Sequence, residues 1–185
     1  MAQNSSSDMK EDGVEYTVAC MHWGVEYQTE ENSDQDEIAQ KLCDMGVDAI
    51  IGGHPHVIEP VDVFTSEDGT HKTFCAFSLG NQLSNQRREM MRLKTGNTED
   101  GLFIDLEITR NKKGDVSLTG VKYIPTWVYK NASGPTYSIV PVDDPSTVEE
   151  KTGIKGIQTQ AQASYDRTYK IIGDGVNKVS EAYGF

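Results

Sequence analysis

The chain has 185 residues, 36% of them hydrophobic, which is enough for one domain with a substantial core. Its 17 basic and 29 acidic residues give a formal net charge of −12, which argues against a general nucleic-acid-binding surface. No apolar stretch approaches the roughly 18 residues that a membrane helix needs, and the first thirty residues lack the apolar core of an export signal.

The start of the chain differs in character from the rest. Residues 1–13 are polar and without period, which predicts a disordered linker or an expression-derived start, with the folded part over residues 14–185. The three cysteines are too few and too widely spaced for a disulfide framework or a zinc pattern. Cys20 and Cys43 lie in apolar runs, so we expect buried free thiols there.

A strand, a helix and a second strand follow in order. Residues 14–21 and 47–51 are rich in β-branched and apolar side chains, and both runs predict strands. Between them, a capping-box pattern at Ser33 predicts a helix start and Gly46 a helix end. This order indicates a βαβ unit, which would bring the loops after both strands to the same edge of a sheet.

The rest of the chain predicts more strands and a helical tail. Further strands are expected at residues 58–64, 72–77, 102–109 and 116–129. Asp68-Gly69 indicates a hairpin turn, and Pro125 is expected to break the last strand. Residues 82–100 indicate a loop with a helical turn. From Asp144 onward a helical tail is predicted, with one apolar face formed by Ile154, Ile157, Ala161, Tyr165, Tyr169 and Ile172.

Three of the four histidines fall where the two predicted βαβ strands end. Because residues i and i+2 of an extended segment point to the same side, His54 and His56 should project together, and Pro55 restricts their directions. With His22 from the neighbouring strand they form a candidate three-nitrogen patch for Mn²⁺, Zn²⁺ or Fe. The alternative is that these rings are structural. His71, in a hairpin turn, is expected to be a surface residue.

Four ordered motifs resemble one family. They are HWGVEY at residues 22–27, GVDAIIGGHPHV at 46–57, SLGN at 78–81 and YIPTWV at 123–128. Together they resemble the CapA-type family of bacterial capsule and poly-γ-glutamate synthesis proteins, over about residues 14–142. The segment NQRR at residues 85–88 is similar to the Firmicutes branch of that family.

The resemblance implies a fold and a set of site residues. The family is similar to calcineurin-like metallophosphatases, which implies an α/β (α+β) fold: a partial αββα sandwich with a mixed sheet. By this comparison His22, His54 and His56 are metal ligands for a divalent metal (Mn, Zn or Fe), and His22 is a candidate catalytic general acid. Glu26 and Asn81 are candidates for substrate binding at the pocket wall.

One departure from the family pattern affects the expected activity. Whole family members begin with a Gly-Asp strand and a later Asn motif, and neither precedes His22 here. The chain therefore resembles the C-terminal part of a larger domain with an incomplete metal site, and we expect it to be inactive alone. An open sheet edge, left where the other part would pair, is a candidate surface for a homodimer.

The resemblance implies a metal-dependent hydrolase or transferase in capsule or poly-γ-glutamate biosynthesis. It would act at the bacterial cell surface, membrane-anchored or extracellular, with an anchor only in the full-length protein. The implied partner is an anionic polymer or a phosphorylated small molecule rather than nucleic acid.

Arg87 and Arg88 are the densest basic spot in the chain and candidates for clamping such an anion, although a solvated loop is the plainer interpretation. The alternative function is a non-catalytic surface protein that binds or guides an anionic polymer. Trp23, Trp127 and Tyr129 are expected in the core rather than on a substrate platform.

Overall fold

A four-stranded mixed sheet carries the two predicted histidine loops. The computed structural model describes residues 9, 11–134 and 136–185, so most of the predicted disordered start at 1–13 lies outside the described residues. The strand order is β1-β2-β4-β3. β2 pairs in parallel with both β1 and β4, and β3 pairs with β4 as an antiparallel hairpin. The bounds are β1 Val18–His22, β2 Ala49–Gly53, β3 Val61–Thr65 and β4 Lys72–Ala76.

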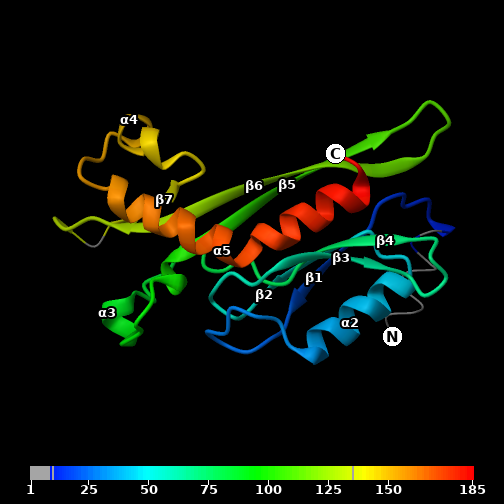
Figure 1. Cartoon of the computed structure of the whole chain (residues 1–185), viewed down its shortest axis with the longest axis horizontal. Helices are drawn as coiled ribbons and strands as arrows, with labels where there is room; N and C mark the ends of the chain where they lie inside the picture. Colours follow the sequence, from blue (N-terminus) through cyan, green and yellow to red (C-terminus); the bar gives the residue numbers. More distant parts are fainter. Residues whose placement is uncertain (1–8, 10, 135) are drawn as a thin grey trace.

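A second sheet and the helices complete the architecture (Figure 1). The second sheet is antiparallel, with β5 (Asp100–Arg110), β6 (Val116–Lys130) and β7 (Tyr137–Pro141) in that order. The helices are α2 Ser33–Asp44, α3 Arg88–Met91, α4 Val148–Thr152 and α5 Gln158–Tyr183, with 3-10 turns η1 Asn97–Glu99 and η2 Pro145–Thr147. The expected α/β (α+β) class with a mixed sheet is confirmed. None of the described helices is long and apolar enough to cross a bilayer.

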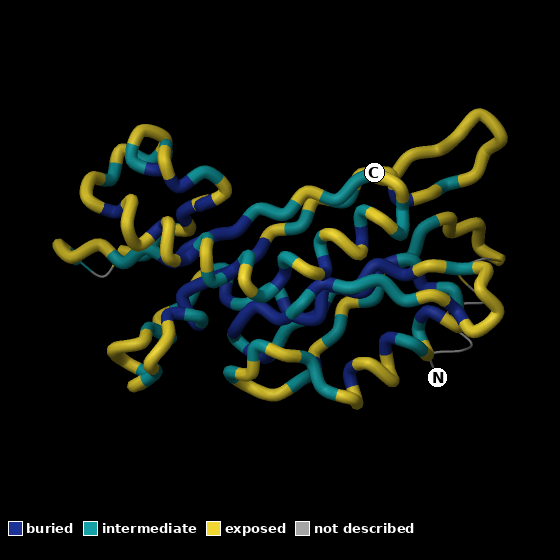
Figure 2. The backbone as a smooth tube through the Cα atoms, in the orientation of Figure 1, coloured by how far each residue is buried: buried dark blue, intermediate teal, exposed yellow. Residues whose placement is uncertain are grey.

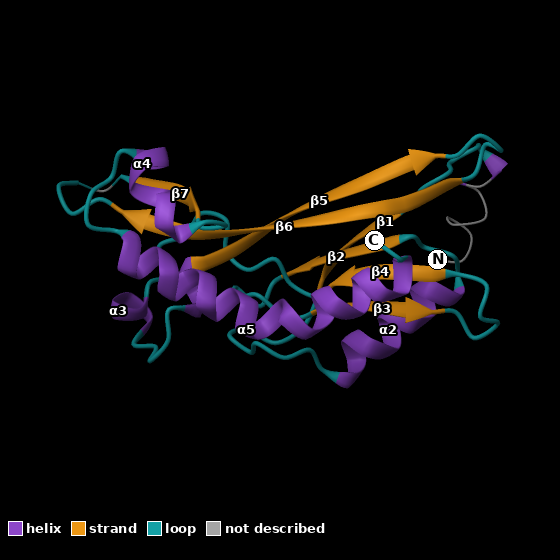
Figure 3. Ribbon diagram, turned by 45° about the horizontal axis from the view of Figure 1, so that its top comes forward, coloured by secondary structure: helices purple, strands orange, loops and turns teal. Residues whose placement is uncertain are grey.

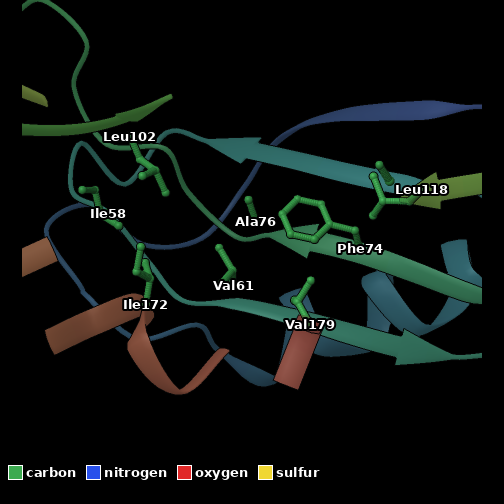
Figure 4. Close-up of a cluster of buried hydrophobic side chains, with 9 residues drawn as sticks. Ile58, Val61, Phe74, Ala76, Leu102, Leu118, Ile172 and Val179 are labelled. Atoms are coloured by element: carbon green, nitrogen blue, oxygen red, sulfur yellow. The ribbon is translucent and has the colours of Figure 1, made fainter. Parts of the chain in front are cut away.

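The central strands β2 and β4 of the first sheet are largely buried on both faces, and alternation along them assigns side chains to two cores. On β4, Phe74 and Ala76 face the second sheet and α5, whereas Cys75 faces α2. The larger core joins both sheets to α5 (Figures 3 and 4); its buried members are Ala49, Ile58, Val61, Phe74, Ala76, Leu102, Leu118, Ile172 and Val179. Helix α5 approaches β3 so closely that a Cβ on Gly175 would lie 1.7 Å from the Val61 carbonyl oxygen. Only glycine fits there.

A third, smaller core lies at the other end of the molecule, where β7, α4 and the start of α5 meet β6. Its buried residues are Trp127, Val140, Val142, Val148, Ile157 and Ala161. Figure 2 shows burial concentrated along the middle of the molecule, with the hairpin tips exposed. Trp23 and Trp127 are both buried, as expected for core aromatics.

Three sequence expectations were wrong in detail. The α2 N-cap is Asn32 rather than Ser33: its side chain accepts from the backbone amide of Gln35, whose side chain accepts from the Asn32 amide. Pro125 does not break β6. Its carbonyl accepts from Val142, so the position of its missing N–H faces the β7 side, just beyond the last residue of β7, and its pairing with Leu102 of β5 is kept.

The third error concerns Cys20. This thiol is exposed, whereas Cys43 and Cys75 are buried. Within the described residues β1 pairs with β2 only and is therefore an edge strand. Its residues alternate between exposed and half-buried, and Cys20 lies on the exposed face with Val18, which is 49% exposed. An apolar run alone does not distinguish an edge strand from a central one.

Candidate functional site

The parallel pairing of β1 and β2 brings the three histidines together. His22 ends β1 and lies opposite Gly53, directly before His54. The ring centroids of His22 and His54 are 4.5 Å apart, and those of His54 and His56 are 6.2 Å apart. His22 is exposed and the other two rings are half-buried, so the cluster is open to solvent. This cluster of His22, His54 and His56 is called the histidine cluster below.

The path of the backbone at this cluster differs from the expected one. His54 and His56 were expected in an extended segment, but their φ angles are +106° and +61°. Both lie in the left-handed region that non-glycine residues seldom adopt, and such strain is typical of functional loops. The rings therefore approach one another through a tight turn after β2, and not through strand alternation.

The residues beneath this turn are packed in close contact. The Trp23 indole donates to the Phe77 carbonyl at 2.8 Å. A Cβ on Gly52 would lie 1.9 Å from that carbonyl oxygen and 2.5 Å from the Trp23 Nε1, so this contact requires glycine. The backbone amide of Trp23 donates to the Gly53 carbonyl and ties the loop after β1 to the end of β2.

His56 has the largest number of side-chain neighbours in the cluster. Its Nδ1 lies 3.2 Å from the Asn81 Oδ1, and its Nε2 lies 3.7 Å from the Glu26 Oε1. The Tyr27 ring stacks on it at a centroid distance of 6.0 Å. The structure thus places Glu26 and Asn81, both singled out from the sequence, at the same imidazole. Tyr27 was missed, although it stands in the HWGVEY motif.

A buried carboxyl group also lies near the cluster and was missed. Glu59 is 0% exposed and accepts from the Gln35 side chain at 2.8 Å. A Cβ on Gly24 would lie about 3 Å from both Gln35 and Pro55. Gln35, and with it the hydrogen bond to Glu59, therefore packs against both histidine loops. An acidic residue inside the apolar segment of residues 57–63 was the available signal. Burial raises the pKa of Glu59 to about 7. The hydrogen bond from Gln35 opposes this rise but is the smaller effect.

Arg87 is the N-cap residue of α3 and Arg88 is its first residue, and both contact Glu99, which is 2% exposed. Arg87 also pairs with Glu89 and donates to the Val128 carbonyl. Burial favours the neutral form of Glu99, but Arg88 and Arg87 hold its pKa below the ordinary value. Since these charges already have partners, anion binding by the two arginines remains a prediction.

The residues of the histidine cluster match a metal site in their chemistry and only in part in their arrangement. Neutral imidazoles with a nearby carboxylate suit Mn²⁺, Zn²⁺ or Fe. In the portion of the chain that the structure covers, however, no three His, Cys, Asp or Glu side chains are arranged to hold a metal ion. The metal-ligand roles of His22, His54 and His56 therefore stay predictions, and further donors would have to join them.

Comparison with known proteins agrees with the motifs. Residues 2–86 match the family model described as "Bacterial capsule synthesis protein PGA_cap". The chain is 30% identical over 108 residues to the PGA biosynthesis protein CapA of Bacillus subtilis (strain 168), a match that covers 58% of this chain and 25% of the relative. It is 31% identical over 83 residues to the capsule biosynthesis protein CapA of Bacillus anthracis, covering 45% of this chain and 19% of the relative.

These matches confirm the resemblance. Residues 2–86, which contain the histidine cluster and the SLGN motif, are similar to the CapA-type capsule synthesis family, whereas the YIPTWV motif lies outside the family-model match. Its fold agrees with part of a metallophosphatase-like α+β sandwich. The chain spans only about a quarter of the length of the Bacillus subtilis relative and about a fifth of the length of the Bacillus anthracis relative.

Proposed function

We propose that the chain acts in bacterial capsule or poly-γ-glutamate biosynthesis, as part of a metal-dependent hydrolase or transferase at the cell surface. Two relatives bear names from this biosynthesis. The observation that carries the proposal is the histidine cluster at the ends of two adjacent parallel strands, open to solvent. Chemistry in α/β folds is typically placed at this edge of the sheet.

Each residue of the site receives a role within this proposal. His22, His54 and His56 supply nitrogen donors to a divalent metal ion whose remaining ligands come from outside this cluster. Such an ion, when bound, supplies Lewis acidity toward a phosphoryl or carbonyl oxygen. In the alternative to ligation, His22, the exposed ring, is the candidate proton donor. Glu26 and Asn81 line the substrate side, with Arg87 and Arg88 toward an anionic polymer or phosphorylated substrate.

The test measures metal binding directly. The purified chain is titrated calorimetrically with Zn²⁺ and Mn²⁺, and His54→Gln is compared with His71→Gln. His71 is the matched control because its ring nitrogen instead contacts the Val47 carbonyl at 2.9 Å. We expect weak binding of one ion, weakened at least about tenfold in His54→Gln and unchanged in His71→Gln.

Two outcomes contradict the proposal. A folded chain that binds neither ion at about 1 mM would refute the metal site and favour the non-catalytic, polymer-binding alternative. Equal weakening in both variants would show that the ion binds elsewhere or that the substitutions act through stability.

A further inference from the structure

Asn81 makes an unusually complete set of contacts around His56. It is 9% exposed, and its Nδ2 donates to the His56 carbonyl at 3.0 Å and to the Thr98 carbonyl at 2.9 Å. The Nδ2 also lies 3.0 Å from the Gln86 side-chain oxygen. On the other side of the amide, the Asn81 Oδ1 lies 3.2 Å from the His56 Nδ1.

These contacts fix the orientation of the Asn81 amide. Backbone carbonyl oxygens accept hydrogen bonds and never donate them. If the amide were flipped, its oxygen would face the carbonyl oxygens of His56 and Thr98, and two buried contacts would become repulsive. The Nδ2 must therefore point toward the carbonyls, which leaves the Oδ1, an acceptor only, facing the imidazole.

We infer that Asn81 is a positioning residue that holds neutral His56 with its proton on Nδ1, leaving the Nε2 lone pair free on the open side of the histidine cluster. An acceptor at the Asn81 Oδ1 requires the ring nitrogen opposite it to be the donor. A neutral imidazole carries one N–H, so the other nitrogen is then bare.

The surroundings of the Nε2 agree with this assignment. The nearest carboxylate oxygen, the Glu26 Oε1, is 3.7 Å away, which is too far for a hydrogen bond. Two acceptors at this separation fit a position where a metal cation would lie between them. On the backbone side, the bond from Asn81 also holds the carbonyl of His56, whose φ is +61°.

The inference rests on the proposed function only for the use of the free Nε2, and its test does not require a metal. The ¹⁵N-labelled chain is treated with chelator at about pH 8.5, where an ordinary imidazole (pKa about 6.5) is neutral. Long-range ¹H–¹⁵N correlation then reports which ring nitrogen of His56 carries the proton. The His56 signals are assigned by their loss in His56→Gln.

Two variants sharpen the measurement. Asn81→Leu removes the acceptor and should lower the ratio of the Nδ1–H to the Nε2–H form about tenfold, the effect of one hydrogen bond. Asn85→Leu is the matched control, since the Asn85 Oδ1 accepts from Tyr137 instead, and its ratio should be unchanged.

Each result decides the question. A parent chain with the His56 proton on Nε2 overturns the inference. An unchanged ratio in a folded Asn81→Leu variant overturns it too. If that variant does not fold, the parent chain decides alone. If His56 carries its proton on Nδ1 but the chain binds no metal, only the proposed function is refuted. If the chain binds metal but His56 carries its proton on Nε2, only this inference is refuted.

Discussion

Two buried carboxyl groups lie near the histidine cluster on different sides, and only one of them has a cationic partner. Glu59 lies beneath the loops, with Gln35 as its hydrogen-bond donor, and its Oε1 has no hydrogen-bond partner among the described residues. Asp100 is 2% exposed and accepts two bonds from Arg167, both at 2.7 Å, and one from Ser164 at 2.6 Å. The Asp100 carbonyl accepts from the backbone amide of Asn81.

The difference shows two ways of burying an acid. Burial raises the pKa of Asp100 to about 6, although Arg167 and Ser164 lower it. Glu59 has no such cation, and burial raises its pKa further, to about 7. The charge of Asp100 is compensated by Arg167, which lies on α5. Glu59 has no cationic partner, so whether it is charged depends on the pH. The two sides of the site should therefore respond to different perturbations.

Removing the cation from Asp100 should have the largest effect. In Arg167→Met the buried carboxylate loses its bidentate partner and must either stay charged without compensation or take up a proton. We expect the free energy of unfolding to fall by about 3 kcal/mol at pH 7.5, measured by urea denaturation. The double variant Arg167→Met/Asp100→Asn should recover much of this loss, because no buried charge remains. A single variant within about 1 kcal/mol of the parent would show that the pair contributes little.

The acid without a cation should give a pH-dependent effect. The folded-state pKa of Glu59, about 7, lies above its ordinary value of 4.5, so the folded chain binds this proton more tightly than the unfolded chain. The resulting stability is fully present below about pH 4.5 and is lost as the pH rises through about 7. Glu59→Gln removes this dependence, and the variant should gain about 1 to 2 kcal/mol over the parent at pH 8.

Urea denaturation of both proteins between about pH 5 and 8 measures the effect of Glu59→Gln. The two free energies of unfolding should converge toward pH 5 and separate above pH 6. Parallel curves across this range would mean that Glu59 is solvated or paired in solution. Glu31, which raises the pKa of Glu59 through its charge, provides a check: Glu31→Gln should reduce the separation slightly.

Local patterns predicted the framework of the site. Apolar runs identified β1 and β2, and their βαβ order correctly predicted that His22 and His54 would meet. Such patterns suffice because strand period and helix termination depend on neighbours in the chain. They did not predict the left-handed turn at His54 and His56, which is stabilised by distant groups such as Asn81.

Contacts between distant residues account for the rest. The pairing of Arg88 with Glu99 and of Asp100 with Arg167 joins residues 11 and 67 positions apart, and no local pattern encodes either pair. The exposure of Cys20 was missed for a related reason, since it depends on which strands flank β1. Glu59 was missed because an acid between apolar neighbours could equally have faced solvent.

An exposed carboxylate completes the comparison and should show the smallest effect. Glu89 pairs with the Arg87 Nε at 2.8 Å, but its side chain is 54% exposed, whereas Arg87 also contacts the buried Glu99. Water and salt screen the exposed pair, and Glu99 continues to neutralise Arg87 when Glu89 is changed. We expect Glu89→Gln to alter the free energy of unfolding by no more than about 0.5 kcal/mol, with little dependence on pH between about 6 and 8. A loss above about 1 kcal/mol would mean that exposure does not determine the strength of these pairs, and that the start of α3 depends on Glu89 as it does on Glu99.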